Sequence, residues 1–146
     1  MIEDINKEFI IPENWLKVEE LKEGVRVNLM AGHCQDCGTV FFPAYQRCIK
    51  CGSEQCKPLV LSGKGTLYSE TVVHQAPNNF STPFRVGYVL FPEGPLVFGQ
   101  FVDMREIQIG DQVEVVLGKL REAESGEAGW AYMYQPTAIS STRGEN

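Results

Sequence analysis

Two short motifs, each with two cysteines separated by two residues, constrain this chain more than any other feature. Cys34-Gln-Asp-Cys37 and Cys48-Ile-Lys-Cys51 are each followed by glycine, and ten residues separate the two motifs. Two thiolates at this spacing can bind one metal ion from a tight turn, and the glycine can take the positive φ that closes the turn. The pattern predicts a zinc ribbon in which Cys34, Cys37, Cys48 and Cys51 form one closed structural site.

Zn²⁺ is the metal that four thiolates favour, because this donor set leaves no open position for catalysis. Iron, as in rubredoxin, uses the same ligands, so the sequence leaves both metals open, and free thiols are the third alternative. Cys56 has no partner at this spacing. We interpret it as a small buried apolar residue, because a nucleophile would need a neighbouring base. His33 and His74 are interpreted as surface or core histidines.

The composition describes an ordinary soluble protein. Of 146 residues, 43% are hydrophobic and 22% are charged, and no apolar run approaches the roughly 20 residues of a membrane span. The N-terminus is acidic and lacks the basic start of a signal peptide, so we expect a cytoplasmic protein with reduced thiols and no membrane contact. The net charge is −6. No segment carries the basic surplus of a nucleic-acid-binding protein.

Hydrophobic spacing predicts one short helix followed by strands. Trp15, Val18 and Leu21 recur every three residues between Pro12 and Gly24, which predicts a helix over 13–23. The alternation of Val25, Val27 and Leu29 predicts a strand that leads into the first cysteine motif. Further strands are expected at 65–76, 84–91, 96–104, 112–120 and 130–139.

These elements predict a mainly β protein with three parts. The five late strands, at this spacing, are typical of a small barrel, and the five-stranded OB fold is the expected architecture. We expect an N-terminal helical segment over 1–30, the zinc ribbon over 31–58, the OB barrel over 59–139 and a tail over 140–146. Segment 84–91 is apolar on both faces. One face would line the barrel, and the other needs cover from the N-terminal helix or from a partner protein.

Three basic residues are candidates for binding a phosphate group. Lys64 lies in Ser62-Gly63-Lys64-Gly65, which predicts either an anion-binding turn or, as we favour, a glycine bulge at the barrel rim. Arg85 lies in an apolar strand, where it can form an internal salt bridge or reach a phosphate, and Arg47 precedes the second cysteine motif. Four aromatic residues could stack on an adenine, although barrel core is the favoured interpretation: Phe80, Phe84, Tyr88 and Phe91.

The chain lacks the motifs of a self-sufficient enzyme. It has no glycine-rich dinucleotide fingerprint, no Gly-x-Ser-x-Gly elbow and no His-Glu-x-x-His. We therefore expect a protein that is not catalytic alone.

The order of the motifs resembles a known family. The two cysteine motifs flank Phe42-Pro43 and are followed by Gly63-Lys64-Gly65-Thr66 and by Ile109-Gly110-Asp111-Gln112-Val113. This combination, over about residues 9–138, is similar to the acyl-CoA-associated family that joins a rubredoxin-like zinc ribbon to a C-terminal OB fold. In layout it most resembles the small subunit of benzoylsuccinyl-CoA thiolase.

The resemblance implies a division of labour. Such proteins assemble with thiolase-fold subunits that carry the catalytic cysteine and histidines. This chain is then expected to be a zinc-containing, non-catalytic subunit of a thiolase-type acyltransferase, with an acyl-CoA near the shared interface. The implied reaction is CoA-dependent cleavage of a β-ketoacyl-CoA, with 2-benzoylsuccinyl-CoA as one substrate, in anaerobic toluene degradation.

Two alternatives from other classes remain open. An OB fold can bind single-stranded nucleic acid, although the neutral middle and acidic flanks argue against it. The chain could also bind CoA esters on its own, in which case Lys64 or Arg85 would be required.

Overall fold

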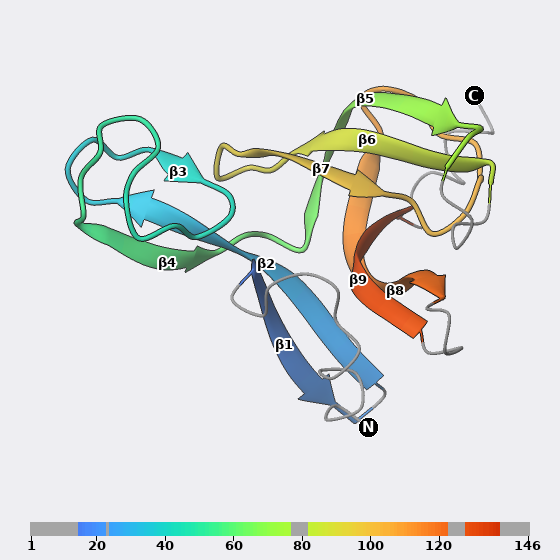
Figure 1. The fold of residues 1–146 in the computed structure, drawn as a ribbon, viewed down its shortest axis with the longest axis horizontal. Helices are drawn as coiled ribbons and strands as arrows, with labels where there is room; N and C mark the ends of the chain where they lie inside the picture. Colours follow the sequence, from blue (N-terminus) through green and yellow to red (C-terminus); the bar gives the residue numbers. More distant parts are fainter. Residues whose placement is uncertain (1–14, 23, 77–81, 123–127, 138–146) are drawn as a thin grey trace.

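Nine strands in two sheets make up the part of the chain that the computed structural model describes, which is residues 15–22, 24–76, 82–122 and 128–137 (Figure 1). The strands are β1 (Leu16–Leu21), β2 (Gly24–Cys34), β3 (Val40–Phe41), β4 (Cys56–Val60), β5 (Lys64–Val73), β6 (Phe84–Leu90), β7 (Leu96–Gln100), β8 (Gln112–Glu122) and β9 (Ala128–Pro136). β2 pairs with β1, β3 and β4, and the second sheet has the order β7-β6-β5-β8-β9.

The predicted N-terminal helix is wrong where the structure describes it, because residues 16–21 form strand β1. β1 and β2 make an antiparallel hairpin in which Leu16 faces Leu29 and Val18 faces Val27. Leu16 and Val18 alternate with polar residues along β1, and both pack on the protein core. Leu21, which the helix would have buried, is 43% exposed. Residues 13, 14 and 23 lie outside the described residues.

Strand β2 joins the hairpin to the ribbon. Its first half pairs with β1, and its second half pairs with β3 and β4, with Cys34 opposite Cys56. Leu29 and Ala31, near its middle, are fully buried in the main core. The ribbon that carries the four motif cysteines is therefore held by a strand that is anchored in the core.

The five-stranded OB-type sheet is confirmed, and its strands β5 to β9 correspond to the five predicted strands. The sheet curves until its two edge strands meet. Phe101, just after β7, forms a parallel bridge with Tyr134 of β9, and the Val102 amide donates a hydrogen bond of 3.0 Å to the Tyr134 carbonyl. The sheet is therefore a partly closed barrel.

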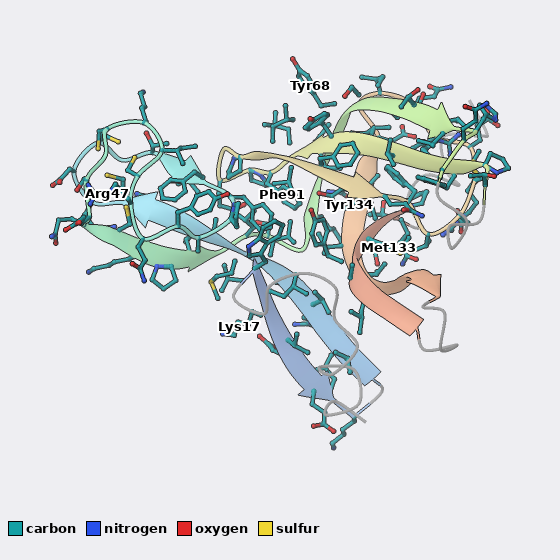
Figure 2. The ribbon with its side chains drawn as sticks, in the orientation of Figure 1. Lys17, Arg47, Tyr68, Phe91, Met133 and Tyr134 are labelled. Atoms are coloured by element: carbon teal, nitrogen blue, oxygen red, sulfur yellow. The ribbon has the colours of Figure 1, made fainter. Side chains whose placement is uncertain are left out.

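Tyr134 lies at the centre of the barrel core. Its side chain is fully buried, and its ring packs near the rings of Phe91 and Phe101. Its hydroxyl donates a hydrogen bond of 3.0 Å to the Val97 carbonyl. Figure 2 shows Phe91 and Tyr134 on the inner side of the curved sheet. The same core includes Leu29 of β2, so the hairpin and the barrel are packed as one unit.

Three aromatic rings connect the ribbon to the barrel. Phe42 of the ribbon makes edge contacts with Trp15 on one side, at 5.5 Å, and with Tyr132 of β9 on the other, at 6.1 Å. Aromatic pairs of this geometry contribute roughly 0.5–1.5 kcal/mol beyond the area that they bury. Among the described residues, no helix has the length and apolar character needed to span a membrane.

Candidate functional site

The four motif cysteines lie on two similar turns. Cys34 ends β2 and Cys37 follows in the turn, while Cys48 and Cys51 occupy the second turn. The glycines after the turns, Gly38 and Gly52, have φ of +80° and +79°, and each amide donates to the carbonyl of the first cysteine at 3.0 Å. Other amides point at the sulfurs, including that of Cys37 at 3.4 Å from the Cys34 Sγ. The structure thus has the backbone that the glycines predicted.

The sulfur atoms are spaced as a tetrahedral metal site requires. The Cys34 and Cys51 sulfurs are 3.6 Å apart, the Cys37 and Cys48 sulfurs are 3.7 Å apart, and all four lie within 4.8 Å of one another. Zn–S bonds of about 2.3 Å in a tetrahedron give sulfur separations of about 3.8 Å. The four residues fit one structural metal ion, and together they would fill its coordination.

The thiols differ in how readily they ionise. Hydrogen bonds with the side chain and backbone of Thr39 lower the pKa of Cys37 to about 6. The Cys37 amide lowers the pKa of Cys34. For Cys51, a backbone hydrogen bond at Ser53 acts to lower the pKa, but the Cys34 sulfur, burial and the other two thiols together raise it to about 12. Binding of a cation therefore has to release the last proton from this cluster.

Polar contacts between the turns hold the ribbon closed. Ser53 donates its hydroxyl to the Asp36 carboxylate, which links the two turns. Arg47 donates to the Gly52 carbonyl at 3.2 Å and pairs with Glu54 at 2.5 Å. Both side chains of this pair are exposed, so the pair itself adds little stability. Arg47 is thus engaged within the ribbon.

Cys56 packs within the ribbon but is not one of the four clustered cysteines. It lies opposite Cys34 on β4 and contacts the small cluster of Cys34, Phe41 and Cys48. Burial raises the pKa of its thiol, which weakens it as a nucleophile. These contacts agree with its interpretation as a packing residue.

The two basic candidates of the barrel lie near opposite ends of strand β5. Lys64 starts β5, exposed, on the wall of an open groove of about 500 Å³ that Arg26 and Asn28 also line. Arg85 is the second residue of β6 and faces Val72 near the other end of β5. Its guanidinium, 12% exposed, pairs with Glu70 at 3.1 Å and donates to the Arg105 carbonyl at 2.5 Å. Of the two interpretations of Arg85, the internal salt bridge is the one the structure contains.

The glycine bulge is misplaced in the prediction. The irregularity of β5 lies between Leu67 and Ser69, beyond Gly65. Gly65 is needed because a Cβ there would lie 2.5 Å from the Val89 side chain of β6. The Ser62 amide and hydroxyl both donate to the Glu93 carboxylate, at 3.1 and 2.6 Å, so an internal anion already uses these donors.

The predicted aromatic set divides between the core and the surface. Phe91 is buried, Phe84 is half-buried, Tyr88 is 43% exposed, and Phe80 lies outside the described residues. Tyr88 contacts Phe98 of β7, with ring centroids 5.3 Å apart. Phe98 was missed by the sequence interpretation, although its alternation with the buried Val97 carries the signal. Of the two histidines, His33 is half-buried in β2 and His74 is exposed.

Comparison with known proteins identifies both halves of the chain. Residues 23–56 match the rubredoxin-like zinc ribbon domain of ChsH2, and residues 60–118 match the C-terminal OB-fold domain of ChsH2. A DUF35 domain-containing scaffold protein of Methanocaldococcus jannaschii is 32% identical over 133 residues, which cover 87% of this chain and 91% of that protein.

Two further relatives carry functional names. The benzoylsuccinyl-CoA thiolase subunit BbsA of Thauera aromatica is 28% identical over 121 residues, which cover 81% of this chain and 83% of that protein. A solved chain of the Ltp2-ChsH2(DUF35) aldolase superposes with a TM-score of 0.59 at 27% identity, over 75% of this chain and 84% of that chain. Because both domain models match in order and the archaeal relative aligns over nearly its whole length, this chain belongs to the DUF35 scaffold family, which joins a ChsH2-type zinc ribbon to an OB fold.

Proposed function

We propose that this chain is the non-catalytic, zinc-bearing scaffold subunit of a complex whose thiolase-fold partner acts on an acyl-CoA. The names of its relatives support the proposal. BbsA is a subunit of a thiolase, and the ChsH2 chain forms an aldolase with Ltp2. Both relatives align with this chain over most of its length, so the ribbon and the barrel are shared.

The chemistry of the cysteines is the observation that carries the proposal. A thiolase needs a free, activated cysteine as its nucleophile. Here four of the five cysteines converge on one metal site, and the fifth, Cys56, is half-buried with a raised pKa. The residues that would form and break the acyl bond therefore belong to a partner, and this chain supplies structure.

The metal in this proposal is Zn²⁺, bound by Cys34, Cys37, Cys48 and Cys51. Its role is to hold two turns together in a ribbon whose own apolar cluster is small. The proposed reaction of the complex is the CoA-dependent cleavage of a β-ketoacyl-CoA. The first substrate to test is 2-benzoylsuccinyl-CoA, which with CoA would give benzoyl-CoA and succinyl-CoA.

For a contact to the CoA phosphates, Lys64 is the strongest of the three basic candidates. Arg47 and Arg85 are engaged by Glu54 and Glu70, whereas no ion pair involves Lys64 among the described residues. A cation that is exposed on a groove wall remains available to an anionic ligand.

Co-expression of the chain with thiolase-fold proteins of the same organism tests the proposal. We expect one of them to copurify with the chain, and we expect cleavage of the β-ketoacyl-CoA to require both. A thiolase that purifies alone and is fully active without this chain would refute the proposal. Strong, salt-sensitive binding of the isolated chain to single-stranded DNA or RNA would instead favour the nucleic-acid alternative.

A further inference from the structure

The outer face of strands β5, β6 and β7 is apolar and exposed. Cross-strand pairing places Tyr88 beside Phe98 and Leu90 beside Leu96 on this face, because partners in an antiparallel ladder point to the same side. These four side chains are 43–50% exposed. Their neighbours in sequence, such as Val89 and Val97, point into the core. We call this surface the β6–β7 face.

The irregularity in β5 adds a third aromatic residue to the β6–β7 face. Leu67 is buried inside the barrel, and the register shift before Ser69 lets both Tyr68 and Ser69 point outward. Among the described side chains of the barrel, Tyr68 is the most exposed aromatic residue, at 59%. Figure 2 shows it projecting away from the inner side, where Phe91 and Tyr134 lie.

Among the described residues, one charged side chain shares the β6–β7 face: Lys64, at its edge, two positions before Thr66 at the start of β5. The other positions that share the face by register are uncharged: Thr66, Ser69, Thr71, Val86 and Gln100. Glu70 and Arg85 occupy the alternate positions and pair with each other there. The face therefore offers aromatic and aliphatic surface with a single cation, Lys64, at its edge.

This charge pattern selects the class of partner. In OB folds the second and third strands form the usual ligand face, and here β6 and β7 are those strands. Single-stranded nucleic acid binds such a face through aromatic stacking combined with basic residues along its backbone. The aromatic residues are present, but Lys64 at the edge is the one cation among the described residues of the face, so the centre of the face fits an uncharged apolar surface of a folded protein.

The size of the face selects between a partner and a second copy. Each of its five large side chains has about 200 Å² of surface and shows about half of it, which gives about 500 Å² of apolar area. A standard protein–protein interface buries about 800 Å² on each side, with an apolar centre and a polar rim. An obligate homodimer commonly buries more than about 2,000 Å² in total. The face matches the centre of a standard interface between different chains.

We propose that the β6–β7 face is the surface that docks on the thiolase-fold catalytic subunit, against an uncharged apolar patch of that subunit. This inference rests on the proposed function, which it deepens by assigning the interface. The hydrophobic effect drives the contact, and Tyr88 and Phe98 form its centre.

A lysine placed in the β6–β7 face tests the inference. Leu90→Lys and Phe98→Lys each put a charge where the interface would have to bury it without a partner, whereas their partial exposure leaves the isolated chain folded. Ile109→Lys is the matched control, because Ile109 is 60% exposed in the turn before β8 and lies outside the face. Binding to the purified thiolase-fold subunit is measured by calorimetry, and circular dichroism and metal content report folding.

We expect both face variants to weaken binding at least about 100-fold and the control to change it less than about 3-fold. Hydroxyl-radical footprinting adds a test without mutation: Tyr88 and Phe98 should be oxidised in the free chain and protected in the complex. Wild-type binding that Leu90→Lys and Phe98→Lys leave intact would overturn the docking face alone. Absence of binding by the wild-type chain would overturn the proposed function and the docking face with it. A wild-type homodimer that Leu90→Lys dissociates, or a single-stranded oligonucleotide that protects Phe98, would also overturn it.

Discussion

Replacing one buried metal ligand should unfold the ribbon and leave the barrel folded. Cys48 is 4% exposed, and its sulfur accepts hydrogen bonds from the Lys50 and Cys51 amides. In Cys48→Ser the site loses one of four thiolates and the anchor of the second turn. The matched control is Cys56→Ser, which removes a sulfur from the same small cluster without touching the four-cysteine site.

The magnitude follows from the size of the ribbon core. Its buried residues are Cys34, Phe41 and Cys48, and burial of one phenylalanine side chain contributes about 2–3 kcal/mol. Structural zinc in small zinc modules contributes about 10–16 kcal/mol. The metal therefore outweighs the apolar contribution several-fold. The barrel has a separate and much larger core, which Cys48→Ser leaves intact.

Metal analysis and hydrogen exchange together check this prediction. We expect the metal content of Cys48→Ser to fall well below one equivalent, with an affinity loss of more than about 100-fold. The amides of Gly38 and Gly52 should lose their protection, while those of Leu67 and Val89 keep it. Cys56→Ser should bind one equivalent. A Cys48→Ser protein with full metal content and native stability would refute the reasoning, and so would loss of protection throughout the barrel.

Three further predictions concern the barrel. Burial raises the pKa of Tyr134 well above 10. Below pH 10 the folded and unfolded states both keep the phenol proton, so stability does not change with pH; above pH 10 only the unfolded chain ionises at this residue, so the free energy of unfolding should fall as the pH rises. The fall should be less steep in Tyr134→Phe. Urea unfolding of both proteins at about pH 8 and about pH 11 measures this difference. Gly99→Ala should destabilise the protein by about 1–3 kcal/mol, because its Cβ would lie 2.5 Å from the Tyr134 ring. Gly63→Ala is the control, because its Cβ would meet only one atom, at 3.6 Å. Equal melting temperatures of the two variants would contradict the packing. Arg85→Ala should destabilise the protein by about 1–2 kcal/mol. A double-mutant cycle with Glu70→Ala should give a favourable coupling energy, and a coupling energy of zero would show that this ion pair does not contribute to stability.

The metal ribbon could be predicted from the sequence because its constraint is local. Cys34 and Cys37 must share a turn whatever the rest of the chain does, and the glycine that follows specifies the positive φ that the structure has. The five barrel strands were also predictable, because alternation and turn residues mark each one. In both cases the information lies within about ten consecutive residues.

The N-terminal strand and the docking face depend on pairing between distant residues. Residues 16–21 have a spacing compatible with a helix, and only the pairing of Val18 with Val27 makes them a strand. The sequence indicated that segment 84–91 has a second apolar face that needs cover. It could not show that Phe98 completes that face, because that requires the register of β6 with β7. Arg85 is similar, since its partner Glu70 comes from another strand.

Native mass spectrometry of the co-expressed complex tests the central claim most directly, because it reports the metal and the partner together. We predict one assembly that contains the thiolase-fold subunit, this 16.4 kDa chain and one Zn²⁺ for each copy of this chain. Stripping the zinc should release the chain from the assembly or leave its ribbon unfolded on it. A spectrum that shows the two proteins only as separate species, at concentrations where the enzyme is active, would contradict the account.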